Sequence, residues 1–161
     1  MHSSVFEISH APVPISERVG AGHLPDWFYE QVCDYAENPD PDRRRAAIGQ
    51  LSGQLGVLCR LEGDRLTVSP QLRAVYFHKS YGDFKAAAKT LSQTGYKEFS
   101  EYHADSVLLS ALDRLNGSYE DKRGVYVYLT ELGELMTLDR WIRTADFSRP
   151  FYIGGVINHY C

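Results

Sequence analysis

The sequence predicts an α+β fold in which a small, mostly antiparallel sheet packs against about four to five helices. The two clearest strands lie late in the chain, at 124–130 and 151–158, while helical periodicity is concentrated in the middle. This order lacks the regular alternation of strands and helices that builds a parallel sheet. The length of 161 residues, with 43% hydrophobic and 24% charged residues, is typical of one domain, here residues 1–161.

The N-terminal third of the chain is predicted to contain one strand and two helices. Residues 5–10 are rich in β-prone side chains. Pro12 and Pro14 follow at once and lack a backbone donor, which favours a short strand at a sheet edge. Pro25 suits the first position of a helix, and apolar residues follow it at helical spacing. A second helix is expected to begin at Asp42, a candidate N-cap.

The next segment is compatible with two structures. Residues 57–61 fit an extended strand that enters a tight turn at Gly63-Asp64, or the end of the preceding helix. A further strand over 65–69 belongs to the first alternative. The sequence does not separate the two.

The middle of the chain is predicted to be helical. Pro70 suits the first position of a helix. Apolar residues then recur at steps of four and three, namely Phe77, Tyr81, Phe84, Ala88 and Leu91. This spacing predicts one long helix whose apolar stripe faces the core, with any kink at Gly82. A further helix is expected to begin near Asp105 and to end at Asn116-Gly117.

Residues 124–130, GVYVYLT, form the clearest strand. Their alternation places the aliphatic residues on one face and Tyr126 and Tyr128 on the other. A tyrosine has an apolar ring and a hydroxyl group that seeks a partner, so an exposed tyrosine face is a candidate contact surface.

The C-terminal segment is predicted to hold a short helix over 138–144, capped by Thr137, and a last strand over 151–158. Gly154 and Gly155 interrupt this strand. Glycine inside a strand indicates a bulge or a close approach of another group. We expect a packed helix in that place, with a bound ligand as the alternative.

Charge argues against one class of function. A net charge of −4 disfavours broad, non-specific binding of nucleic acid. Residues 57–100 nevertheless carry seven basic and four acidic side chains, a net charge of +3. Residues 73–89 in this region combine basic and aromatic residues, which is the combination that binds single strands. A solvated helix face is the competing interpretation.

Arg43, Arg44 and Arg45 are the best candidates for an anion site. They lie at the predicted start of a helix, where backbone N–H groups and guanidinium groups together attract phosphate or carboxylate. The alternative is a solvated basic turn that pairs with the acidic residues beside it.

Catalytic residues are weakly indicated. His159 and Cys161 point to the same face of an extended strand, but the terminal carboxylate of Cys161 would raise the pKa of its thiol. His103 and Asp105 are the nearest histidine–acid pair, and Asp105 also suits a helix N-cap. No phosphate-binding loop, metal-ligand spacing or serine-nucleophile motif occurs, so no cofactor and no metal are expected.

Location and partners follow from what the sequence contains. We expect a cytoplasmic protein with reduced thiols, since there are three cysteines, no signal-peptide pattern and no apolar run long enough to span a membrane. Strands at sheet edges make a homo-oligomer a possible form. A protein partner is expected, and nucleic acid is disfavoured.

The function predicted from these observations is that of a small, non-enzymatic accessory or regulatory protein, which binds a partner macromolecule, most simply a protein, through Tyr126 and Tyr128. Two alternatives stay open. One is an enzyme whose site, built from His159 and Cys161 or from His103 and Asp105, assembles only in three dimensions. The other is a nucleic-acid or anion binder that uses residues 43–45 and 73–89.

Overall fold

A computed structural model describes residues 2–160 and confirms the α+β class. The chain divides into two compact units. The sheet unit contains the residues up to Arg73 and those from Lys122 onward, and the helical unit contains residues 74–121. The interpretation of 1–161 as one domain stays a prediction.

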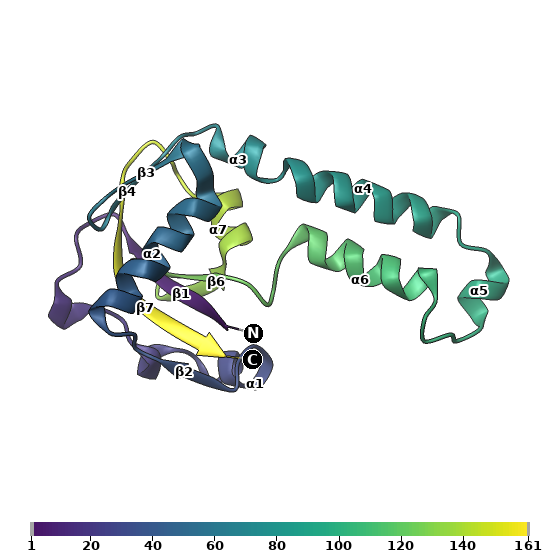
Figure 1. The fold of residues 1–161 in the computed structure, drawn as a ribbon, viewed down its shortest axis with the longest axis horizontal. Coiled ribbons are helices and arrows are strands. Elements are labelled where there is room, and N and C mark those ends of the chain that lie inside the picture. The colour runs from purple at the N-terminus through teal and green to yellow at the C-terminus, as the bar shows by residue number, and fades with distance from the viewer. Residues whose placement is uncertain (1, 161) are drawn as a thin grey trace. The chain divides into compact units, whose positions relative to one another are not determined.

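The sheet unit is built on a seven-stranded mixed sheet, which is larger than the sequence indicates (Figure 1). Its strands are β1 (His2–Ser9), β2 (Tyr35–Glu37), β3 (Cys59–Glu62), β4 (Arg65–Val68), β5 (Tyr126–Leu129), β6 (Glu134–Thr137) and β7 (Phe151–Tyr160). Their order is β3-β4-β7-β1-β5-β6, and β2 also pairs with β7. The pair β1–β5 is parallel and the other pairs are antiparallel.

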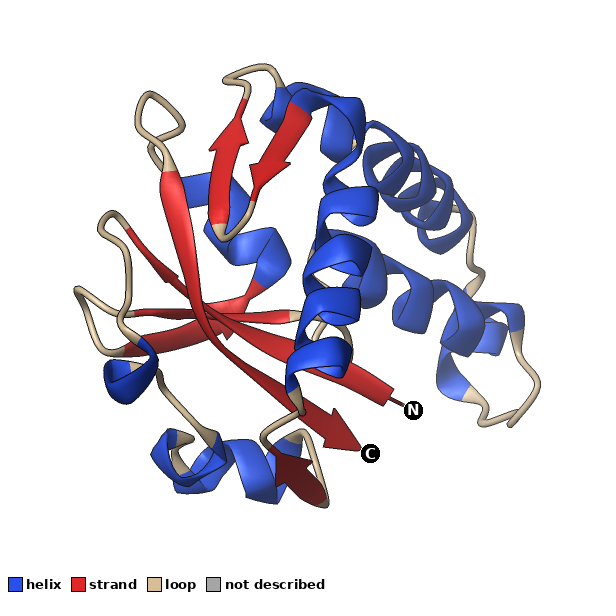
Figure 2. Ribbon diagram, turned by 60° about the vertical axis from the view of Figure 1, so that its left-hand side comes forward, coloured by secondary structure: helices blue, strands red, loops and turns tan. Residues whose placement is uncertain are grey.

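Strand β1 lies in the centre of the sheet, between β7 and β5, so its expected place at an edge is wrong (Figure 2). The strand ends at Ser9, and therefore Pro12 and Pro14 lie beyond the ladder and remove no hydrogen bond from it. The structure also decides between a strand and a helix end for residues 57–61, in favour of a strand that begins at Cys59. A short 3₁₀ turn (Gly56–Leu58) leads into β3, which joins β4 through Gly63 at a φ of 63°.

The helices of the sheet unit cover both faces of the sheet. They are α1 (Asp26–Gln31), α2 (Pro41–Leu55) and α7 (Leu138–Thr144), with 3₁₀ turns at Ile15–Glu17 and Ala21–His23. Phe28 of α1 packs in a cluster with Val5 of β1. Trp141 of α7 packs against Phe151, on the face that carries Ile8. Residues Val5 and Ile8 are three positions apart in one strand and therefore face opposite sides.

Caps explain where two of these helices begin. Thr137 caps α7 as predicted, because its hydroxyl accepts a hydrogen bond from the Arg140 backbone N–H at 3.2 Å. Helix α2 is capped by Asp40 and not by Asp42. The Asp40 carboxylate accepts from the N–H groups of Asp42 and Arg43, and Pro41 takes the first helical position.

The helical unit consists mainly of α4 (His78–Ser92), α5 (Tyr96–Ser100) and α6 (Val107–Tyr119), and α3 (Leu72–Tyr76) leads into it. Helices α4 and α6 pack side by side. The predicted long helix is broken at Phe77 and not at Gly82. Helix α6 is capped by Ser106 and runs past Asn116 to Tyr119. None of the described helices is both long and apolar enough to cross a lipid bilayer.

Candidate functional site

The predicted tyrosine contact face is buried. Tyr126 is 3% exposed and packs edge-on against the Phe28 ring, with the ring centres 5.0 Å apart. Tyr128 is half-buried against the same cluster. Helix α1 and the loop before it cover this face of β5, so the sequence prediction that Tyr126 is exposed is wrong. The alternation in β5 is real, but both of its faces are covered.

His159 is fully buried in the core. Its ring centre lies 5.2 Å from that of Phe28 and 6.0 Å from that of Tyr126, both in edge-on geometry. Cys161 lies outside the described residues, so its relation to His159 stays a prediction. The position of His159 is that of a core aromatic ring, well separated from solvent.

The second pair of catalytic candidates, His103 and Asp105, is exposed to solvent. The Nε2 atom of His103 lies 3.4 Å from a carboxylate oxygen of Glu101, and no contact of His103 with the Asp105 side chain is found. Among residues 2–160, no three histidine, cysteine or acidic side chains gather as metal ligands would. Burial raises the pKa of the Cys59 thiol, and the hydrogen bond with Ser52 opposes this only in part. A raised pKa is the opposite of the lowered pKa that activates a nucleophilic cysteine.

The three arginines of the predicted anion site each contact acceptors of the protein itself. Arg43 pairs with Glu37 at 3.3 Å and Arg45 with Asp42 at 2.9 Å. The Arg44 guanidinium bonds to the Gly154 carbonyl at 2.7 Å, the Ile153 carbonyl at 3.1 Å and the Asp64 carboxylate at 2.9 Å. Arg44 therefore ties α2 to β7, whereas Arg43 and Arg45 are exposed, and anion binding by these arginines stays a prediction.

Gly154 and Gly155 form a bulge around a buried carboxylate that no sequence pattern predicted. The pairing of β1 with β7 shifts between Phe6 and Ile8, opposite the two glycines. Glu7, 2% exposed, accepts hydrogen bonds there. Its donors are the backbone N–H of Gly155 at 2.6 Å, the backbone N–H of Val19 at 2.9 Å and the hydroxyl of Thr130 at 3.0 Å.

The close approach at the glycines is made by this carboxylate and by a loop, and not by a helix or a ligand. A Cβ atom on Gly154 would lie 2.3 Å from a Glu7 oxygen, and one on Gly155 would lie 1.9 Å from the Val19 carbonyl oxygen. A signal was present in the sequence, since Glu7 is an acidic residue within the apolar stretch from Val5 to Ile8.

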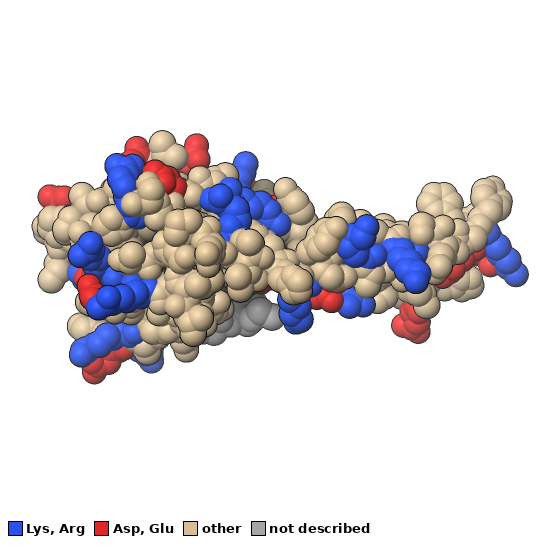
Figure 3. Space-filling view, turned by 90° about the horizontal axis from the view of Figure 1, so that it is seen from above, with Lys and Arg blue, Asp and Glu red and all other residues tan. Residues whose placement is uncertain are grey.

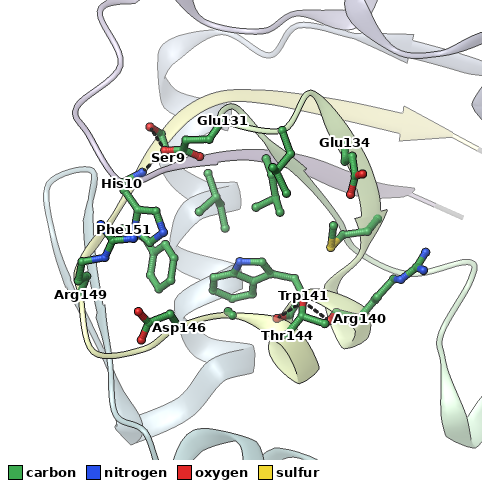
Figure 4. A pocket seen from close by; sticks show the side chains of 15 residues that line it. Ser9, His10, Glu131, Glu134, Arg140, Trp141, Thr144, Asp146, Arg149 and Phe151 are labelled. Atoms are coloured by element: carbon green, nitrogen blue, oxygen red, sulfur yellow. Dashed lines mark hydrogen bonds between the residues drawn. The ribbon is translucent and has the colours of Figure 1, made fainter.

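A cavity of about 630 Å³ opens on the opposite face of the sheet unit (Figure 4). Its base is formed by three buried apolar side chains, Ile8, Trp141 and Phe151. Six ionisable side chains also line it, namely His10, Glu131, Glu134, Arg140, Asp146 and Arg149. The volume lies within the range of small-molecule sites, and an apolar base with a few polar groups is their usual lining.

Two of the carboxylates in the cavity accept hydrogen bonds from the protein. Glu131 accepts from the Ser9 hydroxyl at 2.9 Å and from the His10 backbone N–H at 2.6 Å. Burial acts to raise the pKa of Glu131, but these hydrogen bonds outweigh it and lower that pKa. Hydrogen bonds from the Ser148 side chain and backbone lower the pKa of Asp146, and Arg149 and His10 lower it further.

The helical unit has a different candidate surface. The only buried side chains within 74–121 are Ala87 of α4 and Ala111 of α6. The two helices are also joined by an ion pair between Arg114 and Asp83 at 2.8 Å. Many of its large apolar residues are exposed, namely Val75, Tyr81, Phe84, Tyr96, Phe99, Tyr102, Val107, Leu112 and Tyr119.

This surface corrects the prediction that the stripe of residues 77–91 faces a core. Tyr81 is 61% exposed and no member of the stripe is buried. Figure 3 shows largely uncharged surface over the helical unit, on the right of the view, with separate basic and acidic side chains. The helical spacing of α4 is present, but the fully buried residue of α4 is Ala87, and Tyr81 and Phe84 are exposed.

Comparison with protein-family models, with curated proteins and with solved structures gives no match to this chain.

Proposed function

We propose that this protein is a non-enzymatic accessory or regulatory protein that binds a partner protein through the aromatic surface of its helical unit. The observation that carries the proposal is the placement of its large apolar side chains. Tyr96 and Tyr102 are 85% and 82% exposed, in a unit with no large buried side chain. We place this activity in the cytoplasm, as the sequence indicates.

The energetics support a binding surface. The nine large apolar side chains of this unit that are exposed would leave water on binding, and covering such area contributes roughly 25 cal/mol per Å². Tyrosine and phenylalanine are enriched at protein interfaces because they offer large, rigid contact areas. Nine large apolar side chains of this unit are exposed, and extensive exposed apolar surface often marks a site of protein–protein interaction.

Charge favours protein over nucleic acid as the partner. The helical unit carries five basic and seven acidic side chains, a net charge of −2. A surface that binds nucleic acid needs clustered positive charge. The lysines of α4 are therefore assigned to solvation, and binding through the aromatic surface is expected to depend only weakly on salt.

Site-specific photo-crosslinking in cells that express the protein natively tests this proposal. A photoreactive benzoylphenylalanine replaces Tyr96, and in a control it replaces Val57, which is fully exposed in the sheet unit. The position of Tyr96 is expected to yield a discrete protein adduct that resists nuclease and about 0.5 M salt, at which the Debye screening length is only on the order of 4 Å. The adduct should be lost when Phe99→Asp is added.

Three results would overturn the proposal. Equal labelling at Tyr96 and Val57 would show a non-specific surface. An adduct that nuclease removes would show a nucleic-acid partner. An adduct formed only between two copies of this chain would show self-association instead of a separate partner.

A further inference from the structure

The cavity of the sheet unit is separate from the surface proposed to bind a partner, and its lining indicates a ligand of its own. All of its lining residues belong to the sheet unit. Trp141 is 1% exposed, and Figure 4 shows its indole nitrogen on the edge of the ring that faces the cavity. No acceptor for this N–H is found among residues 2–160. A buried donor that faces an open cavity is complementary to an acceptor on a ligand.

Some charged side chains at the rim of the cavity already interact with other groups of the protein, and others do not. Glu131 and Asp146 take hydrogen bonds from Ser9, His10 and Ser148, as described above. The positive charge of Arg149 helps to lower the pKa of Asp146 by electrostatic attraction. Arg140 has no carboxylate at ion-pair distance in the part of the chain that the structure describes, and it lies on the side of the cavity opposite Arg149 (Figure 4).

This division decides between a cationic and an anionic ligand. The lining holds three carboxylates and two arginines, so a count of charges alone would favour a cation. Two of the carboxylates already accept hydrogen bonds from the protein, although they keep their charge. Glu134 is exposed and, like Arg140, has no ion-pair partner among the described residues. The groups left to a ligand in the cavity are two donors, the Arg140 guanidinium and the Trp141 N–H, and one acceptor, the Glu134 carboxylate. We weigh the two donors higher because the Trp141 N–H lies on the buried base of the cavity.

We infer that this cavity binds an organic anion with a flat apolar body. Its body lies against Trp141 and Phe151, its acid group pairs with Arg140, and an acceptor on the body receives the Trp141 N–H. An aromatic carboxylate that carries a ring hydroxyl has these features. A planar guanidinium suits a carboxylate because it can donate two parallel hydrogen bonds.

A titration with 6-hydroxy-2-naphthoate, followed by the indole N–H signals in NMR spectra, tests this inference. The chain has two tryptophans, and the Trp27→Phe variant leaves the Trp141 signal alone. The Trp141 signal is expected to shift in a saturable way while the Trp27 signal does not. The neutral amide of the same compound is expected to bind about tenfold more weakly, since a charge-assisted hydrogen bond is lost.

Two arginine variants serve as test and matched control. Arg140→Gln is expected to weaken binding about tenfold, whereas Arg149→Gln, whose charge already acts on Asp146, should change it less than about threefold. Both side chains are exposed at the rim, so both variants are expected to fold. The Phe99→Asp variant of the helical unit should bind the naphthoate as the parent does, so that this test and that of the partner surface fail independently.

Three results would overturn the inference. One is the absence of any Trp141 shift at millimolar ligand. Another is binding of the corresponding aminomethyl cation that equals or exceeds that of the carboxylate. The third is an equal loss of affinity in the two arginine variants, which would show a general effect of positive charge and no defined carboxylate site.

Discussion

Glu7 places a carboxylate inside the sheet unit, where it accepts hydrogen bonds from Val19, Thr130 and Gly155. It thereby ties the loop before α1 and the end of β5 to the centre of the sheet. Burying a charged group without partners is costly, and the hydrogen bonds from these three donors offset that cost. The same contacts explain why β7 needs two glycines at the bulge.

The first prediction separates the shape of Glu7 from its charge. In Glu7→Gln the amide oxygen can accept from both backbone N–H groups, while its NH₂ group donates to the Thr130 hydroxyl. We expect a loss of about 1 kcal/mol in the free energy of unfolding for Glu7→Gln, and at least about 3 kcal/mol for Glu7→Leu, which leaves three donors unsatisfied. Urea denaturation measures both. Equal losses would show that the hydrogen bonds do not matter.

The second prediction concerns Gly155. A methyl group there would meet the Val19 backbone, which has no flexible side chain to move aside. Gly155→Ala is expected to lower the free energy of unfolding by about 2–4 kcal/mol. Gly49, inside α2 with open space around it, is the control, and Gly49→Ala should raise stability by about 0.5–1 kcal/mol. Similar values for the two variants in urea denaturation would contradict the assigned contact.

The third prediction is a pH dependence at Glu131. Its folded pKa is lowered, so its contribution to stability is present above the unfolded pKa of about 4.3 and is lost as pH falls through the folded pKa. Glu131→Gln should therefore be less stable than the parent near pH 7, and the difference should shrink in acid. Glu30→Gln, on the exposed surface of α1, is the control and should show no such trend. A constant difference across pH would contradict the prediction.

At the scale of elements, α4 and α6 show how a correct periodicity can lead to the wrong core. Apolar residues that include Tyr81 and Phe84 recur at helical spacing along α4. The residues that are fully buried in the two helices are nevertheless Ala87 and Ala111. Small residues allow two helix backbones to approach closely, which turns the larger side chains toward the outside. Helical spacing of apolar residues predicts that a helix has an apolar face. Which face becomes buried depends on how the neighbouring helix packs against it.

The fourth prediction tests this helix contact. Ala87→Leu inserts bulk between α4 and α6 and is expected to destabilise their packing by about 1–3 kcal/mol. Ala86→Leu, one position away and exposed, is the control and should be tolerated. Hydrogen exchange of the α4 and α6 amides reports the difference. Unchanged protection in Ala87→Leu would show that the helices do not depend on this contact.

At the scale of the whole molecule, the two units have different sources of stability. The sheet unit buries large side chains on both sides of its central strands, including Phe6, Phe28 and Trp141. The helical unit buries only Ala87 and Ala111 within 74–121. A unit with few buried apolar contacts opens at a lower free energy than the global unfolding of the chain.

The fifth prediction follows from this contrast. Native-state hydrogen exchange should show α4 and α6 opening separately, with protection factors about 100-fold or more below those of β1 and β7. Binding of the proposed partner should raise protection in α4 and α6 first, since it would cover their aromatic side chains. Equal protection of helices and central strands in the isolated chain would contradict the division.

Local chemistry in the sequence determined the class of fold, most strand positions and helix α7 with its Thr137 cap, because alternation, turns and caps act between near neighbours. Tertiary structure alone decided the central place of β1, the burial of Tyr126 and His159, and the pairing of Arg44 with Gly154. It also assembled the cavity around Trp141 from β1, β5, β6 and α7. These features depend on which distant segments cover each face, and no local pattern in the chain encodes that choice.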